Sequence, residues 1–73
     1  MKMDKIREFL RRQPFQPFEI RTSEGRVYTV DHPEFIKLYR HDQGVNYTTE
    51  DDRDIVIDAA HIVALEIANS RVA

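Results

Sequence analysis

The chain has 73 residues, of which 41% are hydrophobic, and a formal net charge of −2. A chain of this length folds as one small domain, so residues 1–73 leave no room for separate substrate and cofactor domains. The absence of cysteine excludes a disulfide framework, a thiolate nucleophile and every zinc site that uses cysteine.

Residues 3–12 predict a short amphipathic helix at the start of the chain. Its apolar residues recur at steps of three and four positions, as Met3, Ile6, Phe9 and Leu10. Pro14 ends the pattern, because proline disfavours helical geometry in the residue that precedes it. A helix of this length is not stable alone in water, so we expect its apolar side to pack on a sheet.

Residues 13–18 read Gln-Pro-Phe-Gln-Pro-Phe and predict an extended connector. Each proline fixes an extended backbone, and each phenylalanine supplies an apolar anchor. We expect Phe15 and Phe18 to fill the core where the helix joins the first strand. A docking strip for a partner is the alternative.

The period of the apolar residues changes to two at Phe18, which predicts strands over residues 18–23 and 26–31. Two alternative loop lengths are compatible with the spacing of these strands. A two-residue loop scatters the apolar residues over both faces, whereas a three-residue loop with Gly25 at positive φ keeps them on one face. The predicted cross-strand pairs are therefore Ile20 with Tyr28 and Phe18 with Val30.

A break in the strand pattern follows the hairpin, where Pro33 is placed to begin a short turn of helix. Further strands are predicted over residues 35–40, 45–57 and 62–67. The second of these is interrupted by an acidic turn at residues 50–53, with a strand over residues 45–49 before the turn. After the turn, Ile55-Val56-Ile57 is predicted to be a strand buried on both faces or nearly so.

In the last predicted strand, alternation places Val63, Leu65 and Ile67 on the inward side and Ile62 on the other. Residues 69–73 form a small polar tail that we expect to fray.

Together these elements predict an α+β domain in which the amphipathic helix packs on a strongly bent antiparallel sheet of about five strands. The element order resembles that of the Sm-like or SH3-like small β-barrel. The segment from Ile57 to Leu65 is similar to the strand-turn-strand end of bacterial Sm-like RNA chaperones. The Tyr-Lys-His run with which that family contacts RNA falls on Asp58, Ala59 and Ala60 in this chain, so the resemblance implies the fold and not this contact.

Three short motifs carry a second resemblance: Pro14 to Phe18, Glu24-Gly25-Arg26 and His32 to Phe35. They resemble a group of small, uncharacterised bacterial proteins with a Pro-Phe-x-Pro-Phe connector, an acidic-Gly-Arg hairpin and a His-Pro-Glu-Phe sequence. This resemblance implies a bacterial source and brings no catalytic residue with it.

An apolar face formed by Phe35, Tyr39 and Ile62 is the predicted interaction surface. Such a face can be buried against the helix or another copy of the chain, or it can stack nucleic-acid bases. We therefore predict a non-catalytic module for protein interaction or self-association, with regulatory nucleic-acid binding as the alternative.

Charge is distributed unevenly along the chain. Residues 1–40 hold nine Lys or Arg and six Asp or Glu, a balance of +3, whereas residues 41–73 hold two and seven, a balance of −5. The net charge of −2 argues against a dedicated duplex-DNA binder. If a local basic face binds nucleic acid, the candidate phosphate contacts are Lys5, Arg11, Arg12 and Arg26.

Catalytic and metal sites find little support in the sequence. The two glycines stand alone in separate turns. The sequence therefore contains neither the P-loop pattern nor the Gly-x-Gly-x-x-Gly pattern of dinucleotide-binding loops. His32 and His61 are each expected to serve as turn residues, and no two histidines have the i, i+4 spacing of a metal site. We therefore predict no enzyme activity, no metal and no cofactor.

No apolar run approaches the roughly 20 residues that a membrane helix needs, and residues 1–13 lack the apolar centre of an export signal. We therefore expect a cytoplasmic protein without membrane partners.

Overall fold

The computed structural model describes residues 2–39 and 43–68 of the chain. They form one α-helix, two single-turn 3₁₀ helices and six strands. In chain order these are α1 (Met3–Arg11), β1 (Phe18–Thr22), β2 (Val27–Val30), η1 (Pro33–Phe35), β3 (Ile36–Tyr39), β4 (Gly44–Thr48), β5 (Asp54–Asp58), η2 (Ala59–His61) and β6 (Ile62–Ile67). The tail that was expected to fray, residues 69–73, lies outside the described residues.

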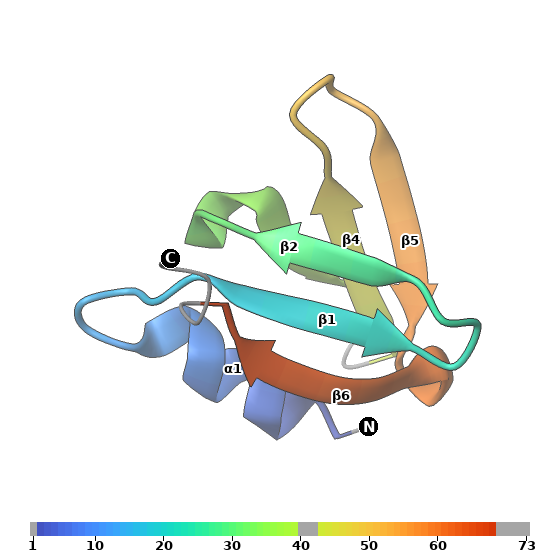
Figure 1. The fold of residues 1–73 in the computed structure, drawn as a ribbon, viewed down its shortest axis with the longest axis horizontal. Coiled ribbons are helices and arrows are strands. Elements are labelled where there is room, and N and C mark those ends of the chain that lie inside the picture. The colour runs from blue at the N-terminus through green and yellow to red at the C-terminus, as the bar shows by residue number, and fades with distance from the viewer. Residues whose placement is uncertain (1, 40–42, 69–73) are drawn as a thin grey trace.

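The strands form two antiparallel three-stranded sheets, with the orders β2-β1-β6 and β3-β4-β5. The α+β class is confirmed. The expected single sheet of about five strands is wrong, and the two sheets do not close into a barrel. Figure 1 shows α1 alongside β6 on one side of the molecule and the β4–β5 hairpin projecting on the other side.

The segment predicted over residues 45–57 forms two strands, β4 and β5, on either side of the predicted acidic turn. The prediction that Ile55-Val56-Ile57 is buried on both faces is wrong, because Val56 is 54% exposed on β5, a strand at the edge of its sheet. Between β4 and β5 the acidic residues form a closed turn, in which the amide of Thr49 donates to the carbonyl oxygen of Arg53 at 2.9 Å. Asp52 has a φ of 71°. A strand cannot continue through a left-handed residue, so the backbone reverses there.

The core lies between the two sheets and is closed by α1. Its buried side chains come from the helix and from both sheets: Met3, Ile6, Phe18, Ile20, Val30, Ile36, Val45, Ile57 and Ile62. The rings of Phe9 and Phe15 meet Phe18 edge-on, with ring centroids 5.0 and 6.1 Å from it. The expectation that the connector fills the core is confirmed, and burying a side chain such as Phe18 contributes about 2–3 kcal/mol.

The β1–β2 hairpin has the register that the sequence predicts, with Ile20 opposite Tyr28 and Phe18 opposite Val30. Gly25 has a φ of 86°. Its amide donates to the carbonyl oxygen of Thr22 at 3.0 Å, which closes the three-residue loop. Because of this register, Phe18, Ile20 and Val30 are buried in the core, whereas Val27 faces outward.

The inward side of β6 differs from the prediction because β6 contains a bulge opposite β1. Arg21 pairs with Ala64 and Thr22 pairs with Ile62, so Val63 is an extra residue between the two pairs. An extra residue inverts the alternation on one side of the bulge. Ile62 is therefore in the core at 2% exposure, and Val63, which was predicted to face inward, is 58% exposed.

Candidate interaction surfaces

The three residues of the predicted apolar surface do not share one surface in the structure. Ile62 is buried in the core, so its assignment to a surface is wrong, and the bulge in β6 is the reason. Phe35 belongs to η1 and its ring meets that of His32 edge-on at 5.4 Å. Tyr39 lies on β3 opposite Gly44. Phe35 and Tyr39 are both half-buried and come from different elements.

The predicted phosphate contacts come from two elements. Lys5, Arg11 and Arg12 belong to the α1 region, whereas Arg26 lies in the β1–β2 hairpin. Lys5 pairs with Glu8 at 3.6 Å. No described residue forms an ion pair or hydrogen bond with the exposed side chain of Arg11.

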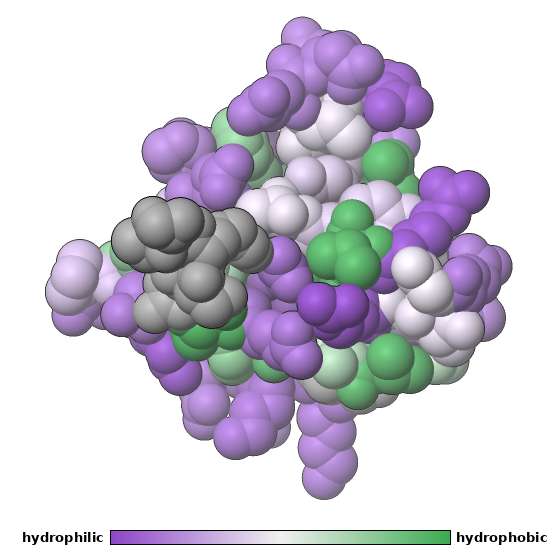
Figure 2. Space-filling model, in the orientation of Figure 1, coloured by the Kyte–Doolittle hydropathy of each residue, from purple (hydrophilic) through white to green (hydrophobic). Residues whose placement is uncertain are grey.

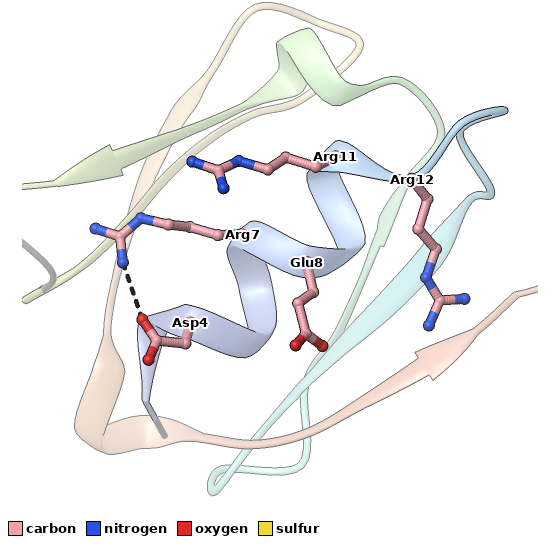
Figure 3. Close-up of a pocket in the computed structure, with 5 residues that line it drawn as sticks. All are labelled: Asp4, Arg7, Glu8, Arg11 and Arg12. Carbon is pink, nitrogen blue, oxygen red and sulfur yellow. Dashed lines mark hydrogen bonds and ion pairs between the residues drawn. The ribbon is translucent and has the colours of Figure 1, made fainter.

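Arg12 has local partners of its own. Its guanidinium lies 4.6 Å from the centre of the Phe9 ring, and its Nη1 donates to the side-chain oxygen of Gln16 at 3.2 Å. Figure 3 shows the Arg12 side chain directed away from Arg11. These contacts give Arg12 a role in fixing the connector to the end of the helix.

Arg7 completes an arginine pair that was not among the predicted contacts. Arg7 and Arg11 extend from successive turns of α1 in the same direction, along an open surface hollow that Asp4 and Glu8 also line (Figure 3). Arg7 donates from Nη1 to Asp4 at 3.2 Å. The four-residue spacing of Arg7 and Arg11 was the available sequence signal, because such residues are neighbours on a helix surface.

The exposed edge of β5 is a second candidate surface. A backbone hydrogen bond lies just beyond each end of this strand. The amide of Thr49 donates to the carbonyl oxygen of Arg53, and the amide of Ala59 donates to the carbonyl oxygen of Gln43. Because bonded and non-bonded pairs alternate in an antiparallel ladder, the backbone groups of Asp54, Val56 and Asp58 point away from β4. Val56 is 54% exposed.

The outer edge of β6 has the same character. The amide of Ala68 donates to the carbonyl oxygen of Pro17 at 2.9 Å, which sets the alternation of the β1–β6 ladder. The backbone groups of Leu65 and Ile67 then point away from β1. Within residues 2–39 and 43–68, no backbone hydrogen bond reaches the outer edge of either β5 or β6.

The hydropathy of the surface does not mark an interface on the face shown in Figure 2. There the described hydrophobic side chains form small patches separated by hydrophilic ones. The candidate interaction surfaces are therefore the open edges of β5 and β6, because this face carries no broad apolar patch.

His32 and His61 have structural contacts. His32 packs on Phe35, and the Nδ1 of His61 lies 3.3 Å from the hydroxyl oxygen of Ser23. The amide of Ser23 also donates to the carbonyl oxygen of His61 at 2.8 Å, so η2 is fastened to the β1–β2 hairpin. Among the described residues, no three His, Asp or Glu side chains are placed to hold a metal ion.

In the part of the chain that the structure describes, no helix is both long and apolar enough to cross a bilayer. Comparison with protein-family models, with curated proteins and with solved structures finds no match to this chain.

Proposed function

We propose that the protein is a non-catalytic, cytoplasmic interaction module that self-associates by strand addition, with β5 of one copy pairing with β6 of the next. The observation that carries this proposal is Val56, an apolar residue 54% exposed in the middle of a strand edge whose backbone groups are available for pairing. An exposed edge of this kind is a template for a strand from another chain.

The neighbours of Val56 support a selective partner. Asp54 and Asp58 are exposed on either side of it. Flanking charges discourage indiscriminate edge pairing, so a partner strand must offer compensating contacts. On β6, the half-buried side chains of Leu65 and Ile67 offer apolar area beside their open backbone groups.

The two edges belong to different sheets, so this pairing is head to tail. Each copy uses its β5 edge toward one neighbour and its β6 edge toward the other. Such an interface builds a ring if the rotation closes and a filament if it does not. The resemblance of the element order to Sm-like and SH3-like folds is a further support for a small module of this kind.

Light scattering after size-exclusion chromatography tests the proposal. The wild type is expected to be larger than a monomer, and Val56→Lys is expected to be monomeric because it places a charge on the paired edge. Val27→Lys is the matched control: Val27 is 44% exposed on β2, outside the proposed interface. A monomeric wild type, or equal effects of the two lysines, would overturn the proposal.

A mixing experiment tests the head-to-tail arrangement. Val63→Asp adds a carboxylate on β6, and Val56→Lys blocks β5, so each variant keeps one intact edge. The mixture is expected to form a one-to-one dimer, although each variant alone is monomeric. If the mixture stays monomeric, β5 and β6 are not the two halves of one interface.

Nucleic-acid binding is the competing outcome. It predicts a purified protein with a high absorbance ratio at 260 over 280 nm, and an affinity that falls steeply as salt rises. Replacement of Arg11 would then reduce nucleic-acid binding, and Val56→Lys would leave it unchanged.

A further inference from the structure

We infer that the β5 edge also binds an extended segment of a different protein, and that a lysine or arginine of this segment enters a hollow between β5 and the β1–β2 hairpin. The inference goes beyond the proposed self-association. It uses the same open strand edge, but it does not need a second copy of the chain.

The hollow lies between β5 of one sheet and the β1–β2 hairpin of the other. It has a volume of about 150 Å³, which suits one side chain rather than a small-molecule ligand. The amide of Ser23 donates to the carbonyl oxygen of His61 at 2.8 Å, so the hairpin side of the hollow is fastened to η2. Figure 1 shows the tip of this hairpin next to η2 at the end of β5.

The hollow has an apolar part and an acidic part. Tyr28, Ile55 and Ile57 form the apolar part, and the exposed Glu24 and Asp58 form the acidic part. Among the described residues that line the hollow, none is a lysine or an arginine. The methylene chain of a basic residue can lie along an apolar surface while its charged head reaches an acidic group. The lining therefore matches a lysine or arginine side chain.

Both carboxylates have oxygens that can accept further hydrogen bonds. No described residue forms an ion pair or a hydrogen bond with the side chain of Glu24. Asp58 accepts from the amide of Ala60 through Oδ1 at 3.1 Å, and no described residue bonds to its Oδ2. Ammonium and guanidinium groups are donors only, so they complement these oxygens in both charge and hydrogen bonding.

A strand added to β5 carries side chains toward this hollow. Side chains alternate along β5, and Ile55 and Ile57 point to the side of the sheet on which the hollow lies. Residues of an added strand that lie beside them project to the same side. The outward backbone groups of Val56 hold such a strand in place, whether it runs parallel or antiparallel to β5.

The β6 strand of a second copy does not supply the cation. Its sequence from Ile62 to Ile67 contains no lysine or arginine, and its charged residue, Glu66, accepts from Arg21 at 3.0 Å. Self-association through β6 therefore leaves Glu24 and Asp58 uncompensated. Charge complementarity favours a basic strand from a different protein, which would displace β6 from the β5 edge.

Peptide binding to the wild type tests the inference. The probe is a short labelled peptide of alternating threonine and valine with one central lysine, and its ends are capped to remove their charges. A matched peptide has glutamine in place of the lysine. By fluorescence anisotropy at low salt, the lysine peptide is expected to bind about tenfold more tightly. This preference should shrink as salt rises.

Two charge-neutralising variants locate the site. Glu24→Gln and Asp58→Asn are each expected to weaken binding of the lysine peptide about threefold to fivefold, and to leave binding of the glutamine peptide unchanged. Asparagine at position 58 can still accept from the amide of Ala60, so η2 keeps its cap. Glu50→Gln is the matched control, because it makes the same charge change in the β4–β5 turn, outside the hollow.

Val56→Pro tests the strand addition. It removes an amide that points away from β4, so the β4–β5 ladder keeps its hydrogen bonds while the open edge loses a donor. This variant is expected to bind neither peptide, and circular dichroism checks that it stays folded. Binding of the lysine peptide to folded Val56→Pro with wild-type affinity would show that the peptide does not add to β5.

The outcomes separate this inference from the proposed function. Equal affinities of the wild type for the two peptides, or equal losses for Glu24→Gln and Glu50→Gln, would overturn the inference and leave self-association standing. A monomeric wild type that prefers the lysine peptide through Glu24 would overturn self-association and leave the inference standing. If both hold, saturating lysine peptide is expected to convert the assembly to monomers in light scattering.

Discussion

The phenol of Tyr47 on β4 donates a 2.7 Å hydrogen bond to the carbonyl oxygen of Thr29 on β2. Thr29 lies on the outer edge of its sheet, where the alternation of the ladder turns its backbone groups away from β1. The bond therefore joins the two sheets and occupies part of the β2 edge. The ring of Tyr47 also lies 5.4 Å from that of Tyr28, which adds an apolar contact across the same gap.

Tyr47→Phe should lower the free energy of unfolding by about 1 kcal/mol, because it removes this hydrogen bond and keeps the ring. Tyr28→Phe is the matched control: Tyr28 packs on the same ring, and its hydroxyl has no described hydrogen-bond partner. Urea denaturation of both variants measures the difference. Equal effects of the two substitutions would show that the Tyr47 hydroxyl does not join the sheets.

Alkaline pH should remove the contribution of the Tyr47 hydroxyl. Burial raises the pKa of Tyr47 above its ordinary value of 10.0, and the charges of Asp31 and Glu50 add to the rise. A group whose pKa is higher in the folded state than in the unfolded state stabilises the fold. This stabilisation is fully present at pH below the unfolded-state pKa, and it is lost as pH rises through the folded-state pKa.

The advantage of the wild type over Tyr47→Phe should therefore be present at about pH 8 and decline above about pH 10. Unfolding midpoints of both proteins across this range measure the decline. An advantage that persists unchanged at about pH 11 would contradict the assigned cause.

The elements set by local chemistry were predictable from the sequence. Gly25 is the residue that tolerates positive φ at the hairpin, and choosing the loop that uses it fixed the register of β1 and β2 correctly. Pro33 begins η1 as the pattern indicates. In both places a single residue restricts the backbone, so no knowledge of distant contacts is needed.

The bulge in β6 was not predictable from alternation. Val63, Leu65 and Ile67 form an unbroken apolar alternation, and only the pairing of β6 with β1 shows that the regular ladder ends at Ala64. The candidate surface failed at Ile62 for the same reason. Which backbone groups of β5 and β6 face outward likewise depends on how each strand pairs with its neighbour. The sequence therefore predicted Arg11 as a candidate contact residue but did not predict the open strand edges.

Gly44 is required by the close approach of β4 and β5. A Cβ atom built on Gly44 would collide with the carbonyl oxygen of Ile57 and lie 3.1 Å from Cα of Asp58. Both contacts are backbone, which cannot move aside as a flexible side chain can. Gly44→Ala should therefore cost about 2–3 kcal/mol of stability through strain.

Gly25→Ala is the informative comparison for Gly44→Ala. At Gly25 a Cβ atom meets nothing within 4 Å, but the φ of 86° is unfavourable for alanine. We expect a loss of about 1 kcal/mol there, and a smaller loss for Gly25→Asn, because asparagine tolerates this region better. If Gly44→Ala costs no more than Gly25→Ala in urea denaturation, the close approach at Gly44 is not rigid.

The bulge itself is tested by two adjacent truncations on β6. Ile62→Ala should cost about 2–4 kcal/mol, because it leaves a cavity in the core, whereas Val63→Ala should change stability by less than about 0.5 kcal/mol. The unbroken alternation predicts the opposite order, with Val63 inward and Ile62 outward. Thermal and urea unfolding of the two variants therefore distinguish a β6 strand with the bulge from one with unbroken alternation. A larger loss of stability for Val63→Ala than for Ile62→Ala would contradict the bulge.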